Sequence, residues 1–359
     1  MSKDKGIYLA ILLLATVLLT SSKSVLSERG QNTDVQSYDK FLTNYTYPFE
    51  VYTYSFSSQG KDMKMAYMYL KPKKTQIGFI TLLHGKNFNG SYWDETAKFL
   101  HEKGFGILVP DQIGFGKSSK PVDYQYTFEV LAHNTKRLLE FLNIESTHVI
   151  GHSMGGMLGS RFALLYPDLT RHLILVNPIG LENYLLYSEY KDVDFFYQKE
   201  SKLTSADIIS YQKKYYYDGK WNTKFAKYAN PLIGLINGPD WKELAKISLL
   251  VYDMIFTGSV IEEFPYFQMS VTLVLGTRDR TGLGRAWMKP NITYELGRYD
   301  KLGNKVKTYN SEIEVIELKD IGHAPQLEDF DGFRKVLENT IEKNKLKFEC
   351  YSHRQACVL

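Results

Sequence analysis

The chain has 359 residues, 44% of them hydrophobic, which is enough for one large α/β domain with insertions or for two smaller domains. Its 44 basic and 40 acidic residues give a net charge of only +4, which is too small to indicate a nucleic-acid partner. The two cysteines, Cys350 and Cys357, lie in the last ten residues. They either close a short C-terminal loop or stay as free thiols.

The N-terminus has the pattern of a targeting segment. Lys3 and Lys5 precede an apolar run over residues 7–19, and Ser22 and Ser24 follow it as small residues. This pattern is typical of a secretory signal peptide, here over residues 1–24, and predicts a secreted or periplasmic protein. Because a membrane span needs about 20 residues, we expect no stable span, and an uncleaved N-terminal membrane anchor is the alternative.

Strands and helices are expected to alternate through the first half of the chain. A polar, flexible leader is expected over residues 25–44, followed by a hairpin of two strands with alternating residues. The expected strands cover residues 49–56, 64–70, 77–83, 106–109, 147–151 and 172–176, and the expected helices cover residues 94–102, 128–142 and 157–166. Such alternation predicts a parallel sheet with crossover helices.

The second half of the chain interrupts this alternation. Residues 177–265 lack strand-like runs and are rich in tyrosine and phenylalanine, so we expect a helical insertion rather than a separate domain. Aromatic side chains of this kind can line a pocket for an apolar substrate. Strands over residues 270–276 and 312–318, a loop-rich stretch over 282–310, a helix over 330–342 and a tail over 346–359 complete the expected order.

The segment Gly151-His152-Ser153-Met154-Gly155-Gly156 lies between an expected strand and an expected helix. A serine between two glycines at such a turn is typical of a nucleophile elbow, in which the hydroxyl stands above the edge of a sheet. The same letters also fit an ordinary glycine-rich turn, so the other members of a catalytic triad decide between the two interpretations.

Asp279 and His323 follow the serine in the order in which such triads occur. Each comes directly after an expected strand, at the sheet edge where active sites collect. We therefore expect Ser153 to attack a carbonyl, His323 to accept its proton and Asp279 to hold the histidine tautomer. Asp111 precedes the serine in the chain and is not the expected acid.

Two backbone N–H groups are expected to form an oxyanion hole. One belongs to Met154, directly after the nucleophile, and the other to the loop that follows residues 77–83. In that loop Lys86 is the preferred donor and Asn87 the alternative. His84 and His152 are expected to shape their loops rather than to catalyse.

No cofactor or metal site is indicated by the remaining motifs. Residues 111–118 contain two glycines but lack the spacing of a P-loop, so they predict a tight loop beside the active site. No cluster of histidine, cysteine or carboxylate has metal-ligand spacing.

Taken together, these motifs resemble the α/β-hydrolase superfamily, in particular its esterase, lactonase and carbon–carbon hydrolase branch. The resemblance covers roughly residues 45–345 and rests on residues 84–85, 111–118, 151–156, 276–279 and 322–325. It implies an α/β fold with an eight-stranded, mostly parallel sheet, a helical cap over residues 178–265 and no cofactor.

The resemblance implies a serine hydrolase that cleaves a carboxylic ester of a small to medium apolar molecule through an acyl-enzyme. The alternatives are a lactonase or carbon–carbon bond hydrolase with the same triad, or an inactive ligand-binding relative. Haloalkane dehalogenases and epoxide hydrolases of this superfamily carry aspartate at the elbow, so Ser153 argues against both. Met154 also departs from the tryptophan that usually follows the nucleophile in proline iminopeptidases.

Overall fold

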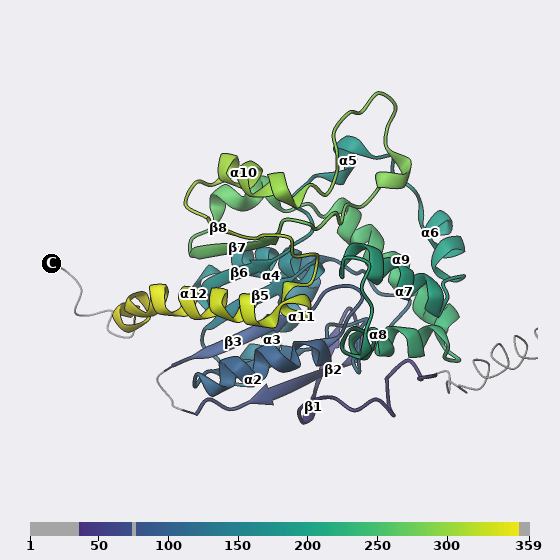
Figure 1. The fold of residues 1–359 in the computed structure, drawn as a ribbon. Helices are drawn as coiled ribbons and strands as arrows, with labels where there is room; N and C mark the ends of the chain where they lie inside the picture. Colours follow the sequence, from purple (N-terminus) through teal and green to yellow (C-terminus); the bar gives the residue numbers. More distant parts are fainter. Residues whose placement is uncertain (1–35, 74–76, 352–359) are drawn as a thin grey trace, which may run out of the picture. The chain divides into compact units, whose positions relative to one another are not determined.

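Eight strands form a single sheet at the centre of the computed structural model, which describes residues 36–73 and 77–351, the last eight by their backbone alone (Figure 1). The strand order is β1-β2-β4-β3-β5-β6-β7-β8. The strands are β1 Val51–Ser58, β2 Lys61–Leu70, β3 Phe79–Leu83, β4 Gly106–Pro110, β5 Thr147–His152, β6 Thr170–Val176, β7 Ser270–Gly276 and β8 Glu314–Leu318. Strand β2 is antiparallel to both of its neighbours, and every pairing from β4 to β8 is parallel. The expected eight-stranded, mostly parallel sheet is confirmed.

Helices cover both faces of this sheet, which explains the continuous apolar runs of its inner strands. One face packs on α3 Phe128–Phe141, α4 Met154–Leu165 and α10 Tyr299–Tyr309, and the other packs on α2 Asp94–Glu102 and α12 Phe330–Tyr351. In β3, Leu83 belongs to the first of these cores and its neighbour Leu82 to the second. Successive side chains of a strand point to opposite faces, so each inner strand contributes to both cores.

Residues 178–265, which we call the cap, are helical and connect β6 to β7. The cap consists of α5 Tyr184–Tyr187, α6 Val193–Glu200, α7 Ser205–Tyr215, α8 Thr223–Ile236, α9 Trp241–Thr257 and the 3₁₀ helix η3 Ile261–Tyr266. Asp192, Thr204 and Asn222 cap α6, α7 and α8, each accepting a hydrogen bond from the backbone N–H three residues on. Helices α6 to α9 lie together beyond one end of the sheet (Figure 1).

We expected the stretch over residues 282–310 to be loop-rich, but part of it is helical. It contains the short 3₁₀ helix η4 Arg285–Trp287 and then the three-turn helix α10. Tyr299, Leu302 and Val306 form the buried stripe of α10, which packs against β7 and η3. Gly303 obscures this helical spacing in the sequence, because glycine weakens the interior of a helix.

The prediction of a flexible leader over residues 25–44 is also wrong for the last residues of this range. Leu42 is fully buried, and the N–H of Tyr38 donates to the carbonyl of Gly234 in the cap at 2.8 Å. The ammonium of Lys40 donates to both carboxylate oxygens of Glu243 at 2.9 Å. These partners lie about two hundred residues away in the chain, so local composition cannot reveal them.

Several predictions concern residues outside the described part of the chain. The signal peptide over residues 1–24 lies there, as do most of the expected leader and Cys357, so these stay predictions. The backbone of Cys350 continues α12, which shows that the expected tail begins as helix. Within residues 36–73 and 77–351, no helix has both the length and the apolar character needed to cross a bilayer.

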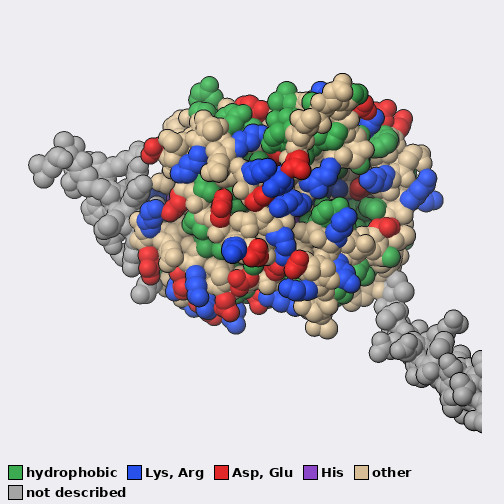
Figure 2. Space-filling model, turned by 45° about the horizontal axis from the view of Figure 1, so that its top comes forward, with side chains coloured by type: hydrophobic (Ala, Val, Ile, Leu, Met, Phe, Trp, Pro, Cys, Tyr) green, Lys and Arg blue, Asp and Glu red, His purple; other side chains and the backbone are tan. Residues whose placement is uncertain are grey.

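Charged side chains of both signs are mixed over the face shown in Figure 2. This face therefore carries no broad patch of a single sign, in keeping with a net charge of only +4. A polyanion such as nucleic acid is held mainly by clustered cations, so this face gives no support for such a partner.

Candidate active site

Ser153 occupies a strained turn between β5 and α4. Its φ of 57° and ψ of −120° are rare for a residue with a side chain. The turn needs glycine on both sides, because a Cβ on Gly151 would lie 2.1 Å from the carbonyl oxygen of Gly155. A Cβ on Gly155 would lie 2.1 Å from the carbonyl oxygen of Leu83 in β3. The glycine pattern in the sequence thus marks a place where two strands and a helix approach closely.

The structure brings Ser153, Asp279 and His323 into one hydrogen-bonded series. His323 Nδ1 lies 2.7 Å from Asp279 Oδ2, and His323 Nε2 lies 2.9 Å from Ser153 Oγ. A carboxylate only accepts, so Nδ1 carries the proton and Nε2 is free to accept the serine hydroxyl. All three residues are buried and follow β5, β7 and β8 at their carboxyl ends. This arrangement can move a proton from the serine to the histidine.

Asn177 is a further residue of this site, which the sequence motifs did not indicate. Its side-chain nitrogen donates to Asp279 Oδ2 at 2.8 Å, and its side-chain oxygen accepts the N–H of Gly276 at 2.9 Å. It follows β6 directly and has a φ of 38°, in the left-handed region that asparagine tolerates. An asparagine at the carboxyl end of the strand beside β7 was the available signal.

The surroundings of Asp279 favour its charged form. Burial raises the pKa of this carboxyl, but the charge and hydrogen bond of His323 and the donors from Asn177 and Thr281 outweigh burial. The net result is a pKa below the ordinary value for aspartate. Asp279 therefore stays an acceptor for the histidine Nδ1–H.

The loop after β3 passes directly beside the nucleophile. A Cβ on Gly85 would lie 3.2 Å from Ser153 Cβ. In the described part of the chain, no backbone carbonyl accepts from the N–H of Met154, Lys86 or Asn87. Met154 opens α4, where the helix dipole favours negative charge. These placements fit the expected oxyanion donors, and the choice between Lys86 and Asn87 stays a prediction.

The ring of His152 connects two loops of the site. Burial lowers the pKa of His152 to about 3, so the ring is neutral. Its Nε2–H donates to the carbonyl of His323 at 2.8 Å, which leaves Nδ1 to accept the hydroxyl of Tyr92 at 3.0 Å. The Tyr92 oxygen in turn accepts the N–H of Gly85 at 3.3 Å. His152 thus joins the loop after β3 to the backbone of His323.

His84 has a comparable place within its own loop. Its Nδ1 donates to the carbonyl of Gly85 at 3.0 Å, and its Nε2 accepts the N–H of Gln112 at 3.1 Å. Burial lowers the pKa of this imidazole as well. Both ring nitrogens are used inside the loops, which fits the expected loop-shaping role.

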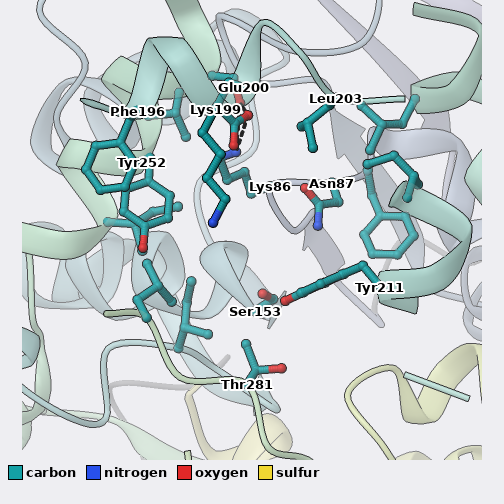
Figure 3. Close-up of a pocket in the computed structure, with 18 of the residues that line it drawn as sticks. Lys86, Asn87, Ser153, Phe196, Lys199, Glu200, Leu203, Tyr211, Tyr252 and Thr281 are labelled. Carbon is teal, nitrogen blue, oxygen red and sulfur yellow. Dashed lines mark hydrogen bonds and ion pairs between the residues drawn. The ribbon is translucent and has the colours of Figure 1, made fainter. Parts of the chain in front are cut away.

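A cavity of about 590 Å³ lies between the sheet edge and the cap, with Ser153 and His323 in its wall (Figure 3). Its apolar lining from the cap includes Phe196, Leu203, Ile208, Tyr211, Leu244 and Tyr252. Residues 280–287 close another side of the cavity. A cavity of this size holds a small to medium organic molecule.

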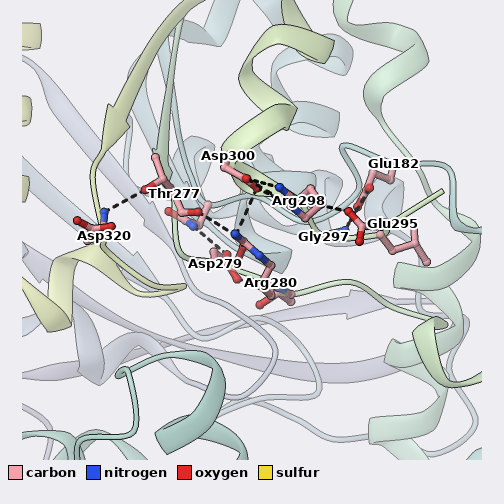
Figure 4. A network of polar contacts seen from close by, with 12 residues as sticks. Glu182, Thr277, Asp279, Arg280, Glu295, Gly297, Arg298, Asp300 and Asp320 are labelled. Atoms are coloured by element: carbon pink, nitrogen blue, oxygen red, sulfur yellow. Dashed lines mark hydrogen bonds and ion pairs between the residues drawn. The ribbon is translucent and has the colours of Figure 1, made fainter. Parts of the chain in front are cut away.

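A polar network supports the loop that carries Asp279 (Figure 4). Arg280 donates to the carbonyls of Thr277 and Asp279 at 2.8 and 2.6 Å and lies 3.4 Å from Asp300. Asp300 also accepts from Arg298 at 2.6 Å, at the start of α10. The start of α10, a helix that the sequence pattern did not predict, therefore helps to hold the loop of Asp279 in place.

Across the residues that the structure describes, no group of three or more histidine, cysteine, aspartate or glutamate side chains is arranged to hold a metal ion.

The chain matches known proteins in both sequence and structure. A family model for the α/β hydrolase fold matches residues 79–230. A crystal structure of a probable hydrolytic enzyme from Pseudomonas aeruginosa PAO1 is 38% identical, with a TM-score of 0.82 over 85% of this chain and 98% of that one.

Two curated relatives show the range of names in the family. A protein of Pantoea ananatis named for carbamate hydrolysis (RutD) is 33% identical over 113 residues, which is 32% of this chain and 41% of the relative. Lipase 1 of Psychrobacter immobilis is 24% identical over 274 residues, 72% of this chain and 77% of the relative. The match to the first of these spans well under two thirds of its length. Together with the fold, the comparisons show that the chain belongs to the α/β-hydrolase family.

Proposed function

We propose that this protein is a serine hydrolase that cleaves a carboxylic ester of a small to medium apolar substrate through an acyl-enzyme. The observation that carries the proposal is the series Asp279–His323–Ser153, with contacts of 2.7 and 2.9 Å, in the wall of an apolar cavity. A nucleophile, its base and the group that orients the base are the parts that acyl transfer by serine requires.

The reaction follows from these positions. Ser153 Oγ attacks the ester carbonyl as His323 Nε2 takes its proton, and Asp279 stabilises the imidazolium. The N–H groups of Met154 and Lys86 bind the oxyanion of the tetrahedral intermediate. His323 then protonates the leaving alcohol, and the acyl group remains on the serine. Water, deprotonated by His323, attacks the acyl-enzyme and releases the acid.

The lining of the cavity supports an apolar acyl or alcohol group. The cap provides aromatic and aliphatic side chains around the space in front of Ser153, and burying apolar area there stabilises binding by about 25 cal/mol per Å². Lactones and cleavable carbon–carbon bonds would meet the same three residues, so substrate profiling separates these reactions from ester cleavage.

The test is a Ser153→Ala variant assayed on p-nitrophenyl esters, lactones and β-diketones. Ester hydrolysis by the wild type should fall by at least roughly 10³-fold in the variant, because the acyl-enzyme cannot form. Ser146→Ala, at a serine outside the site, is the matched control and should keep full activity. A fluorophosphonate probe should label the wild type and not Ser153→Ala. Retained ester hydrolysis in Ser153→Ala, or a wild type that the probe does not label, would refute the proposal.

A further inference from the structure

Two consecutive side chains of the loop after β3 reach from the sheet edge into the cap (Figure 3). Lys86 Nζ donates to Ser248 Oγ of α9 at 2.7 Å and lies 3.6 Å from Glu200 at the end of α6. Ser248 Oγ donates in turn to Glu200 at 2.5 Å. Asn87 Nδ2 donates to the hydroxyl of Tyr216, just after α7, at 3.2 Å. The loop is therefore attached to three cap segments.

These attachments are sheltered from water. The side chains of Lys86 and Glu200 are only 19% and 16% exposed. An ion pair this far removed from solvent is screened less than a surface pair. Loss of the ammonium would leave the Glu200 carboxylate with Ser248 as its hydrogen-bond partner, in a wall that is otherwise largely apolar. The contact therefore helps to hold the loop against the cap.

The backbone of the same two residues lies at the reaction centre. Lys86 supplies the preferred oxyanion N–H and Asn87 the alternative, and Gly85 before them packs against Ser153. The loop is short and tightly turned, because the N–H of Phe88 donates back to the carbonyl of Gly85 at 3.1 Å. Attaching the Lys86 side chain to the cap therefore restricts the positions that this turn, and the amide of Lys86 within it, can occupy. Oxyanion donors must lie within about 2.7–3.1 Å of the developing charge, so small displacements reduce the rate.

We propose that the cap sets the geometry of the oxyanion hole through Lys86 and Asn87, which act as positioning residues. This inference rests on the proposed function. A substrate whose apolar part packs against α6 and α9 holds the cap closed, and the cap holds the oxyanion donors in place. Binding energy from the remote part of the substrate then appears in the rate of acylation rather than in affinity.

The experiment measures acylation of Ser153 under single turnover with p-nitrophenyl acetate and p-nitrophenyl octanoate. In the wild type, acylation should be faster with octanoate than with acetate, because only the longer chain reaches the cap. Lys86→Met should lower acylation by octanoate about tenfold, with less than about twofold change in the substrate dissociation constant. Lys86→Arg should restore most of the rate, because guanidinium can still reach Glu200.

A double-mutant cycle tests whether the contact itself is responsible. Ser248→Ala should lower acylation by a similar factor, and Lys86→Met combined with Ser248→Ala should be no slower than the slower single variant. Lys202→Met removes a lysine that follows α6 outside the cavity and should act like the wild type. If Lys86→Met fails to fold in thermal unfolding, Asn87→Ala and Tyr216→Phe provide the same cycle through the second attachment.

Two results would overturn the inference. One is a weaker substrate dissociation constant at an unchanged acylation rate, which would make Lys86 a simple substrate contact. The other is multiplicative loss in the double variant, which would make the two side chains independent. A wild type that neither hydrolyses esters nor reacts with a fluorophosphonate would instead refute the proposed function, so the two failures are distinguishable.

Discussion

Asn177 shows how one buried side chain can tune a catalytic carboxylate. It makes two hydrogen bonds at once, one to Asp279 and one to the backbone that leads into the Asp279 loop. Each of these partners is buried, so neither hydrogen bond is readily replaced by water. Asn177 therefore affects both the charge on Asp279 and the position of its loop.

We expect Asn177→Ala to reduce kcat for ester hydrolysis about tenfold and to lower the thermal unfolding midpoint. The change removes a donor that helps to keep the pKa of Asp279 low, and it leaves the N–H of Gly276 without its acceptor. Steady-state kinetics and thermal unfolding measure the two effects. Asn183→Ala, in the loop that follows and outside this network, is the control. An unchanged kcat in Asn177→Ala would show that the contact has no part in catalysis.

The sequence identified some site residues and not others for a physical reason. Ser153 is marked by glycines two positions before and after it, and Asp279 and His323 follow expected strands, so each has a local signal. Asn177 also follows an expected strand, but that position alone does not give it a role, because its partner is 102 residues away and the contact exists only when β6 and β7 lie side by side. Which loop amide faces the oxyanion depends on a turn geometry that residue types do not encode.

At the scale of elements, the elbow depends on how closely β3, β5 and α4 approach one another. We expect Gly155→Ala to destabilise the protein by roughly 3 kcal/mol or to prevent folding, since the new methyl group would lie 2.1 Å from a backbone oxygen in β3. Urea unfolding provides the measurement. Gly159→Ala, one turn later in α4, meets only side-chain carbons at 3.2 Å and beyond, so its effect should stay within about 1 kcal/mol. Equal stability of the two variants would contradict this interpretation.

The elements that sequence patterns predicted well are those whose signal is continuous. The inner strands are apolar on both faces, and α3 and α4 carry long apolar stripes. Helix α10 was missed because only four of its 11 residues are buried, and one of these is a glycine. The packing of Leu42 was missed because it depends on the cap, far away in the chain.

At the scale of the whole molecule, buried neutral histidines make the free energy of unfolding depend on pH in the acidic range. Burial lowers the pKa values of His148 and His152 to about 3, and that of His84 also falls. The unfolded chain takes up protons at these positions near pH 6.5, whereas the native state does so only at lower pH. Below pH 6.5 the unfolded state therefore binds more protons, and the free energy of unfolding decreases as the pH falls.

Between pH 7 and pH 5, we expect the free energy of unfolding of His152→Gln to fall by about 2 kcal/mol less than that of the wild type. Glutamine can still donate and accept hydrogen bonds but does not titrate. Urea unfolding at the two pH values measures the difference. His133→Gln, at an exposed position on α3, should show the same pH dependence as the wild type. A pH dependence of His152→Gln equal to that of the wild type would contradict this linkage.

The cap leaves the sheet after β6 and returns to it at β7, and these two strands are neighbours that pair from His172 to Val176. The two strands are parallel, so the end of β6 and the start of β7 lie at opposite edges of the sheet. The N–H of Val260 nevertheless donates to the carbonyl of Gly180 at 3.3 Å, which brings the two ends of residues 181–259 together. A foreign helical segment can therefore be grafted between these two residues without cutting the strands that carry the chemistry. Such an exchange would change which substrates the cavity accepts and would leave the catalytic residues unchanged. For the reaction to stay efficient, the grafted segment must also provide the partners of Lys86 and Asn87. Glu200, Ser248 and Tyr216 are therefore the residues that it must keep.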